Sequence, residues 1–302
     1  MVAYFDLFDY PVTRDELYRY LPAKMQPAAF DRSLECLVKE RLLYQEKNFY
    51  ALHPHPFLFQ RRMKGNALAT QMLKRAHRVA RFLYAFPFVR FVGISGSLSK
   101  QFAEENSDLD FFIITARNRL WMARTLLHLF KKLSYLRGRQ HWYCMNYFID
   151  EDHLEIAEKN IFTAMETVTL VPSAGSEMYK YFADENAWVA TFFPNDSEDK
   201  EKRECKESNS WMKRLFESLL SLELFNPIEK ILWKITRGRW LKKETKGALN
   251  RKGAPMSLIT SPYFARPNPN LFQKKLLRSY QEKLKQVRMH LPVPEEINML
   301  MK

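Results

Sequence analysis

The chain has 302 residues, of which 46% are hydrophobic and 27% charged, as is ordinary for a water-soluble globular protein of two or three domains. Only 8 residues are glycine, so the composition favours a helix-rich fold over a loop-rich all-β fold. The formal net charge of +14 favours an anionic partner, such as a nucleotide, a nucleic acid or a phosphorylated substrate, although a basic solvated surface gives the same balance.

Cysteine usage and the length of the apolar runs bear on localisation. Cys36, Cys144 and Cys205 are scattered and form no CxxC pair, which fits a reducing cytoplasm and disfavours a cysteine-built zinc site. No apolar run approaches the roughly 20 residues of a membrane span, and the first residues lack the basic start of a secretory signal. We therefore expect a cytoplasmic protein with no membrane contact.

Residues 1–57 have the pattern of a small helical module that ends in a hairpin. A first helix is expected over Val2–Tyr10, and Thr13 with Glu16 forms a capping box that opens a second helix. Pro27 suits the first turn of a third helix, and two short apolar runs within residues 42–52 indicate a β-hairpin. Three helices followed by a hairpin resemble a winged helix-turn-helix.

Such a module often binds DNA by placing its third helix in the major groove. Here the third helix and its end carry as many acidic as basic residues, namely Asp31, Glu35 and Glu40 against Arg32, Lys39 and Arg41. This balance makes a poor surface for phosphates. The residues therefore favour a role in packing or partner binding over DNA binding.

Positive charge is concentrated in two segments. Residues 60–90 carry eight Lys and Arg and no acidic residue, and most of this segment belongs to a long basic helix expected over residues 58–86. Residues 226–302 carry 17 Lys and Arg against 5 Asp and Glu. The basic helix and the C-terminal region are therefore candidate contacts for nucleic acid.

The most informative stretch is residues 88–115, where an apolar strand is followed by a small-residue turn and then by two aspartates. The turn Ser95–Ser97 follows the strand Phe88–Ile94 and precedes a short helix expected over Leu98–Glu104. Glycine permits close backbone approach, and the N–H groups and dipole at a helix start favour phosphate. The turn alone is a weak signal, because many turns contain Gly-Ser.

Asp108 and Asp110 strengthen the signal. Residues two apart in a strand point to the same face, so both carboxylates project together, while Leu109 and Phe111 enter the core. Two like charges this close are costly without a cation between them, and Mg²⁺ binds through one or two carboxylates plus substrate phosphates. The alternative is a pair of solvated acids at the start of a strand.

The run GSLSKQFAEENSDLDF resembles the signature of the DNA polymerase β-like nucleotidyltransferase superfamily, in which a Gly-Ser turn precedes two acids that are each followed by a hydrophobic residue. The resemblance implies transfer of a nucleoside monophosphate from an NTP to an acceptor hydroxyl, with release of pyrophosphate. It implies that Asp108 and Asp110 are catalytic and hold one or two Mg²⁺ or Mn²⁺ ions. The nucleotide-binding residues that we predict are Gly96, Ser97, Ser99 and Lys100.

Members of this superfamily usually have a third carboxylate on a later strand, which helps to activate the acceptor hydroxyl. In the strand expected over His141–Asp150, alternate residues share one face: Cys144, Asn146, Phe148 and Asp150. Asn146 has the central position and is our third predicted catalytic residue, although an amide brings no negative charge and cannot act as a base. The remaining candidates for the carboxylate are Asp150, Asp152 and Glu155.

The rest of the chain is mainly helical by pattern. Trp233, Trp240 and Tyr263 lie among Lys and Arg, where they either stack on a base or pack in the core. Glu166 lies on a short helix near enough to reach the site, but we expect it to face solvent.

Together these patterns predict an α+β fold in four parts: a winged-helix-like module (1–57), a connecting basic helix (58–87), a nucleotidyltransferase-type mixed sheet with flanking helices (88–175) and a helical C-terminal region (176–302). The predicted function is metal-dependent nucleotidyl transfer from an NTP to an unidentified acceptor: a small molecule, a protein or an RNA end. The alternatives are a catalytically weak or inactive nucleotide-binding relative with a regulatory role, and a winged-helix DNA-binding regulator.

Overall fold

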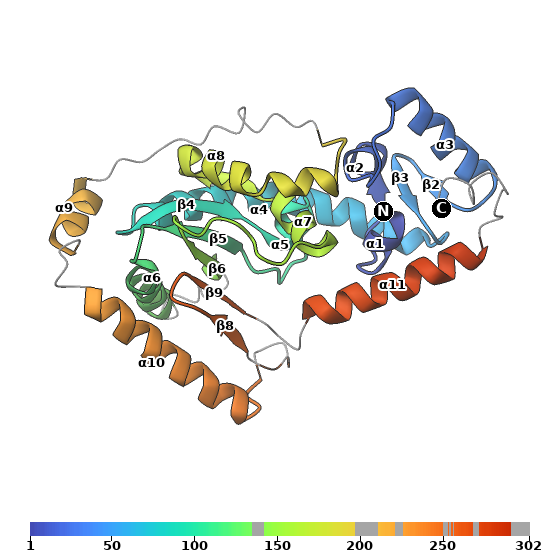
Figure 1. The fold of residues 1–302 in the computed structure, drawn as a ribbon. Coiled ribbons are helices and arrows are strands. Elements are labelled where there is room, and N and C mark those ends of the chain that lie inside the picture. The colour runs from blue at the N-terminus through green and yellow to red at the C-terminus, as the bar shows by residue number, and fades with distance from the viewer. Residues whose placement is uncertain are drawn as a thin grey trace. The chain divides into compact units, whose positions relative to one another are not determined.

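The computed structural model describes residues 1–134, 142–196, 211–220, 226–249, 253, 255, 257–267 and 272–290 (Figure 1). The α+β class expected from the sequence is confirmed. By contacts between Cα atoms the chain forms two compact units. The first unit comprises residues 1–63, 190–197 and 272–302, and the second comprises residues 64–189 and 198–271. The C-terminal helix thus groups with the N-terminal residues, whereas the sequence pattern placed it with the preceding helices.

The first unit contains a small three-stranded antiparallel sheet and short helices, in the order α1 (Val2–Asp6), β1 (Val12–Thr13), α2 (Arg14–Arg19), α3 (Pro27–Lys39), β2 (Tyr44–Glu46) and β3 (Phe49–Ala51). The strand order is β1-β3-β2. The expected capping box is present, because the Thr13 hydroxyl accepts from the Glu16 N–H and the Glu16 carboxylate accepts from the Thr13 N–H. The first helix ends at Asp6, before the expected Tyr10, and Pro27 begins α3 as expected.

A buried arginine holds the core of this unit together. Arg62, on the first turns of α4 (Pro56–Tyr84), is only 1% exposed. Its guanidinium donates to Glu16 at 2.7 Å and to the Pro11 carbonyl at 3.0 Å, and it lies 3.8 Å from the ring centroid of Tyr10. Since these partners satisfy the charge, the arginine is compatible with burial.

Two later segments complete the first unit. On α11 (Phe272–His290), Lys283 pairs with Asp6 at 2.6 Å, and the Tyr280 ring meets that of Tyr4 edge-on at 5.5 Å. The side chain of Asn195 accepts from the Met25 N–H and donates to the Ala23 carbonyl, and it is 4% exposed.

The second unit is built on a six-stranded sheet of order β7-β4-β5-β6-β9-β8. Its strands are β4 (Val89–Ile94), β5 (Asp110–Thr115), β6 (Cys144–Asp150), β7 (Val171–Ala174), β8 (Leu258–Thr260) and β9 (Phe264–Pro267). β5 and β6 pair in parallel, and the other neighbours pair antiparallel, so the sheet is mixed. The expected strand start at His141 lies outside the described residues.

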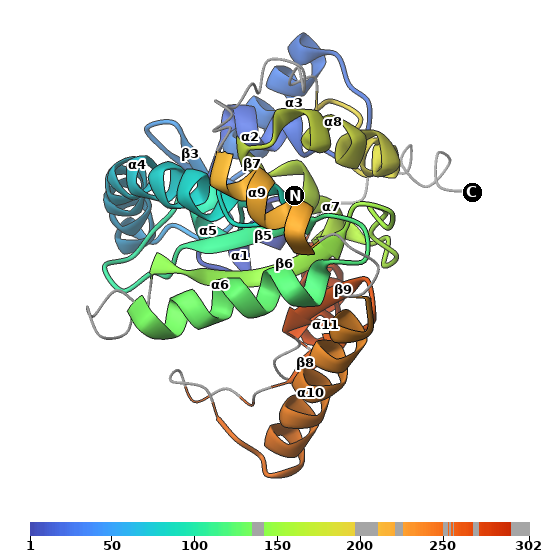
Figure 2. The ribbon, with the colours of Figure 1, turned by 90° about the vertical axis from the view of Figure 1, so that its left-hand side faces the viewer.

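Helices pack on both faces of this sheet. The helices that follow β4 in the chain are α5 (Gly96–Ser99), α6 (Leu120–Ser134), α7 (Ile161–Val168), α8 (Ser176–Glu185), the 3-10 helix η3 (Ala187–Thr191), α9 (Trp211–Leu220) and α10 (Asn226–Thr245). On one face α4 and α6 pack on a core that includes Phe111 and Phe148. On the other, α8 packs on a core that includes Phe112 and Ile149. α6 and α8 therefore lie on opposite sides of the strands (Figure 2).

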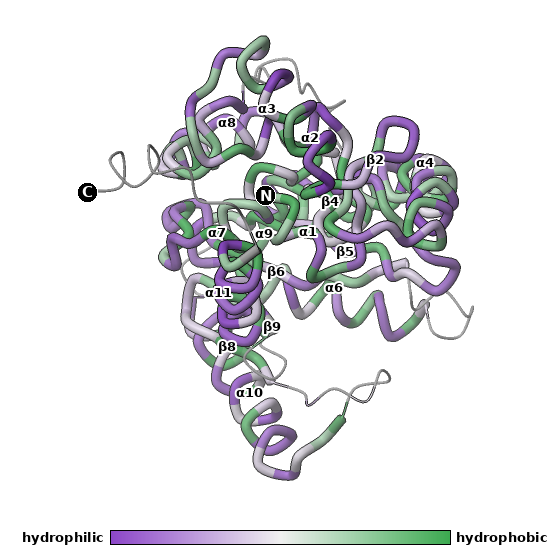
Figure 3. The backbone as a smooth tube through the Cα atoms, turned by 90° about the vertical axis from the view of Figure 1, so that its right-hand side faces the viewer, coloured by the Kyte–Doolittle hydropathy of each residue, from purple (hydrophilic) through white to green (hydrophobic). Residues whose placement is uncertain are grey.

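The hydropathy of α4 follows this packing. In Figure 3 the turns of α4 contain both hydrophobic (green) and hydrophilic (purple) residues. Its fully buried positions in the second unit are Ala69, Ala76, Ala80 and Leu83, which recur at helical spacing and face the sheet. This apolar stripe is thus the packing surface of the basic helix.

The start of α6 is capped by a carboxylate from α10. Glu229 accepts hydrogen bonds from the N–H groups of Trp121 and Met122 at 2.5 and 2.9 Å. These are first-turn N–H groups, which have no partner within their own helix. Glu229 is 8% exposed, and burial raises its pKa to about 7. The carboxylate thus joins α10 to α6.

Candidate functional site

The Gly-Ser turn lies directly against Asp110. Gly96 has a φ of +72°, and a Cβ atom added to it would lie 2.6 Å from Oδ2 of Asp110. The Ser95 N–H donates to the Asp110 carbonyl at 3.0 Å, which holds the turn against the start of β5. Both the backbone conformation and the close approach therefore require glycine at this position. The structure brings the two halves of the predicted site together.

The helix after the turn is shorter than expected. α5 covers only Gly96–Ser99, and Gln101 has a φ of +54°, which ends the helical path. The Phe102 N–H instead donates back to the Ser97 carbonyl at 3.1 Å. A helix of four residues has little dipole, so the expected dipole contribution is not supplied, and any phosphate here depends on turn amides and side chains.

The predicted phosphate-binding side chains differ in orientation. Ser97 is exposed, whereas Ser99 is 9% exposed and its hydroxyl donates to the Gly96 carbonyl at 2.8 Å. The Lys100 ammonium donates to the same carbonyl at 3.1 Å and pairs with Glu166 at 2.7 Å. Ser97 is thus the hydroxyl open to a ligand, and Ser99 stabilises the turn. Glu166 contacts Lys100 beside the turn, although the sequence suggested that it faces solvent.

The two aspartates lie at the beginning of β5. Asp110 is the first residue of the strand, and Asp108 lies in the loop just before it. Both are half-buried, while Leu109 and Phe111 are 1% and 0% exposed, in the predicted core orientation. The pKa of the Cys144 thiol is raised to about 12, first by burial and then by the negative charges of Asp110 and Asp108. Both carboxylates therefore lie within electrostatic range of Cys144.

A β-bulge points Asn146 at Asp110. In the pairing of β5 with β6, Phe111 lies opposite Met145 and Phe112 opposite Tyr147, so Asn146 is the extra residue. Its amide nitrogen donates to Oδ1 of Asp110 at 2.6 Å. The amide oxygen accepts from the Cys144 thiol at 3.1 Å. Asn146 thus lies at the site where the sequence analysis placed it.

The bulge also overturns one expectation. Strict alternation placed Cys144, Asn146, Phe148 and Asp150 on one face of β6. In the structure Phe148 packs with Met145 in the core under α4 and α6, and Ile149 lies in the core on the opposite face. The prediction of one shared face was wrong, because an extra residue in a strand exchanges the two faces beyond it.

The other candidates for a third carboxylate are engaged elsewhere. Asp150 lies opposite Thr115, at the other end of β5 from Asp110. It accepts from the Asn118 and Asp152 N–H groups at 2.7 and 2.9 Å, and burial raises its pKa. Two further candidates pair with basic neighbours, Asp152 with Arg117 and Glu155 with Lys159.

The donor chemistry fits a hard divalent cation only in part. Carboxylate oxygens of Asp108 and Asp110 are ligands that Mg²⁺ and Mn²⁺ accept, and substrate phosphates complete such sites. Within the described residues, no group of three or more His, Cys, Asp or Glu side chains is placed to hold a metal. The residues therefore offer two carboxylates, with the amide of Asn146 hydrogen-bonded to that of Asp110.

The aromatic residues predicted as stacking candidates differ in their surroundings. Trp233 packs against the main core and its indole N–H donates to the Thr260 hydroxyl at 3.4 Å. Trp240 is half-buried with the Lys243 ammonium 4.9 Å from its ring centroid. Tyr263 is 41% exposed and stacks on His153, with ring centroids 3.9 Å apart. The contacts of Trp233 agree with a packing role.

Comparison with known protein families, with curated proteins and with solved structures yields no match for this chain. Among the helices that the structure describes, none is both long and apolar enough to cross a membrane.

Sequence reasoning missed the contact between Lys100 and Glu166. The two residues are 66 positions apart: Lys100 directly follows α5, and Glu166 lies on α7. No spacing rule connects such a pair, because the approach of α7 to the turn depends on how the sheet is ordered. The only available signal was that Glu166 lies in a helix next to a strand of the same sheet.

Proposed function

We propose that the protein is a metal-dependent nucleotidyltransferase, which transfers a nucleoside monophosphate from an NTP to an acceptor hydroxyl. The observation that carries the proposal is the close approach of the Gly96 turn to the Asp110 carboxylate. A Cβ atom added to Gly96 would lie 2.6 Å from Oδ2 of Asp110. The backbone of the turn thus lies next to the Asp110 carboxylate. Such an arrangement suits a triphosphate that is held by amides on one side and by cations on the other.

In this proposal the acceptor oxygen forms a bond to the α-phosphorus while the bond from that phosphorus to the bridging oxygen breaks. Pyrophosphate leaves, and the proton of the acceptor hydroxyl passes to water. The turn amides and the Ser97 hydroxyl bind the β- and γ-phosphates, and Lys100 contributes a positive charge beside them. Asp108 and Asp110 hold one or two Mg²⁺ or Mn²⁺ ions. When bound, these ions neutralise the phosphate charge and polarise the reacting oxygens. The acceptor is a small molecule, a protein or an RNA end.

The position of Asn146 favours a second candidate, a nucleotide-binding protein with slow or no turnover. Its amide nitrogen donates to Asp110 and cannot take a proton from an acceptor hydroxyl. The residue that would act as the general base is therefore not a carboxylate at this position. In such a regulator, binding of the nucleotide rather than its conversion carries the function.

A winged-helix DNA-binding regulator has less support. The first unit has the element order of a winged helix, but Asp31 on α3 is already held by the Arg14 guanidinium at 2.8 and 2.9 Å. A helix that presents such a pair offers phosphates little net charge. Retention on DNA that falls steeply with added salt would favour this reading. Contacts of nucleic acid with the basic segments of α4 and α10 are likewise proposals.

The test separates the first two candidates. Each labelled NTP is incubated with the protein, Mg²⁺ or Mn²⁺ and cell extract, and both bound nucleotide and labelled product are measured. We expect Asp110→Ala to abolish both, because it removes a metal ligand beside the turn. Asp184→Ala, an exposed carboxylate on α8, is the matched control and should change neither.

Each outcome has a distinct meaning. Labelled product that depends on Asp110 supports the transferase. Binding that depends on Asp110 without product supports the regulator, and gain of turnover in Asn146→Asp would identify the missing acid as the cause. If the wild-type protein binds no NTP, or if binding survives Asp110→Ala, both candidates fail.

A further inference from the structure

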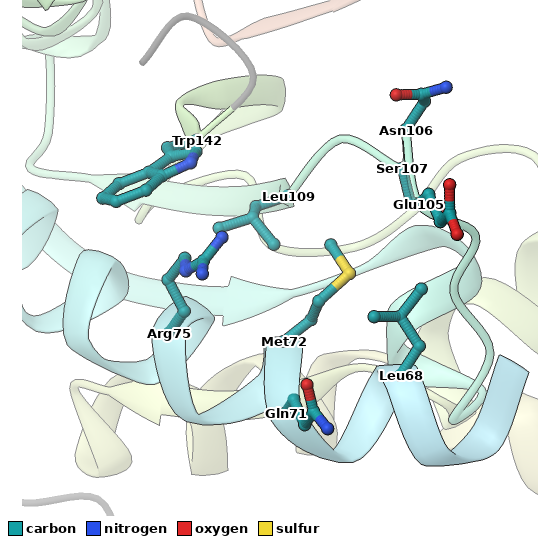
Figure 4. A pocket seen from close by; sticks show the side chains of 9 residues that line it. All are labelled: Leu68, Gln71, Met72, Arg75, Glu105, Asn106, Ser107, Leu109 and Trp142. Carbon is teal, nitrogen blue, oxygen red and sulfur yellow. The ribbon is translucent and has the colours of Figure 1, made fainter. Parts of the chain in front are cut away.

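A cavity of about 300 Å³ opens in the second unit, between α4 and the loop that carries the two aspartates. The proposed reaction does not use it. Its volume is at the lower end of the range of small-molecule pockets, so it suits a ligand of the size of a single ring system with substituents. Figure 4 shows its lining from close by.

The centre of the cavity is apolar. Leu68 and Met72 reach it from α4, and Leu109 closes it from the loop side (Figure 4). Leu109 is 1% exposed, and its side chain lies in the core on the α4 side of the sheet. An apolar centre of this kind contacts the face of a flat ring, because thioether and aliphatic groups pack well on aromatic surfaces.

One end of the cavity carries a stacked pair. The Arg75 guanidinium lies 4.8 Å from the ring centroid of Trp142. Arg75 is exposed, and within the described part of the chain no carboxylate pairs with it. A guanidinium that lies over an indole ring contacts it through its planar face, so its N–H donors remain available at its edge. This end therefore offers both a flat surface and hydrogen-bond donors.

The rim carries groups that both donate and accept. Gln71 on α4 and Asn106 on the loop each have an amide, and Glu105 has a carboxylate. In the described residues these three side chains make no hydrogen bond or ion pair. Amides form paired hydrogen bonds with the edges of nucleobases, and arginine does so with guanine. The lining thus matches a flat ring with polar edges.

We propose that this cavity is a second ligand site, which binds the base of a free nucleoside or nucleotide. The apolar centre contacts the face of the base, Arg75 and Trp142 supply the stacking surface, and the Arg75 donors with the Gln71 amide bind its edge. The proposal stands independently of the transferase reaction, because the cavity lies on the α4 side of the sheet, whereas Asp110 faces the Gly96 turn and Asn146.

The experiment measures binding of the four ribonucleosides, which lack phosphates, to the full chain by isothermal titration and saturation-transfer NMR. We expect at least one nucleoside to bind. Arg75→Ala should weaken that binding about tenfold, since it removes a stacking surface and its donors. Arg75→Lys, which keeps the charge but not the planar group, should also weaken it. Lys74→Ala is the matched control: it removes the neighbouring exposed charge on the same helix and should have no effect.

Asp110→Asn separates this site from the proposed nucleotide site. If nucleoside binding persists in Asp110→Asn and weakens in Arg75→Ala, the proposal is supported. Binding lost in Asp110→Asn and unchanged in Arg75→Ala would place the nucleoside at the Gly96 turn and overturn the proposal. The absence of nucleoside binding overturns it as well, including the case in which only RNA oligonucleotides bind in an Arg75-dependent way.

Discussion

Replacement of Gly96 by alanine tests whether the turn and Asp110 form one site. At a φ of +72° an alanine costs about 1–2 kcal/mol relative to glycine, because its Cβ crowds the backbone. The new Cβ would also lie 2.6 Å from Oδ2 of Asp110, so the carboxylate must move. Overpacking of this kind costs typically about 1–3 kcal/mol. We therefore expect Gly96→Ala to lower the free energy of unfolding by about 2–5 kcal/mol.

Gly247 provides a matched control. Its φ is +60°, and no atom lies within 4 Å of the position of an added Cβ. Gly247→Ala therefore incurs the conformational cost without the contact, and we expect a loss of only about 1–2 kcal/mol. Unfolding in urea, followed by circular dichroism, gives the two free energies.

The same pair of variants separates stability from ligand binding. Titration of Mn²⁺ and an NTP should show weaker binding in Gly96→Ala, because the displaced Asp110 carboxylate is a predicted metal ligand, and unchanged binding in Gly247→Ala. Equal losses of stability in the two variants, together with equal binding of Mn²⁺ and NTP, would refute the contact between the turn and the carboxylate as the basis of the site.

Three further predictions concern stability and reactivity. Gly238→Ala, in the middle of α10 with no atom near the added Cβ, should raise the free energy of unfolding by about 0.5–1 kcal/mol in urea; a loss of stability would contradict the open position of this residue. The pKa of Glu229 is raised to about 7 from an ordinary value of 4.5. The protonated carboxyl therefore contributes to the free energy of unfolding fully below pH 4.5, and this contribution is lost as the pH rises through 7. That loss amounts to about 3 kcal/mol, and urea unfolding at several pH values should show it in the wild type and a flatter profile in Glu229→Gln. The pKa of the Cys144 thiol is raised to about 12, so this thiol should react with iodoacetamide at neutral pH far more slowly than the exposed Cys36. Peptide mass spectrometry measures the two rates. Equal rates would show that the surroundings of Cys144, including the two aspartates, do not raise the pKa of its thiol.

The local parts of the site could be predicted from the sequence because they depend on neighbours in the chain. Gly96 and Asp110 lie at facing ends of two antiparallel strands joined by one loop, so their approach follows from strand pairing. The capping box of Thr13 and Glu16 is local in the same way. In each case a few residues determine the geometry.

The non-local parts could not be predicted. The bulge at Asn146 depends on how β6 pairs with β5, and no residue in the strand marks it. Glu229 reaches the start of α6 across 108 positions of sequence, and Asn195 reaches Met25 across 170. Such contacts depend on the order in which whole elements pack, which periodicity along one element does not report.

The bulge on β6 determines where the side chain of residue 146 lies, but it does not determine which side chain stands there. The backbone already directs residue 146 at Asp110, whatever side chain it carries. Asparagine and aspartate codons differ by one base, and the two side chains have nearly the same size and shape. A single point mutation can therefore exchange an amide for a carboxylate here without remodelling the strand. In evolutionary terms, gain or loss of the acid at this position is a short step in either direction.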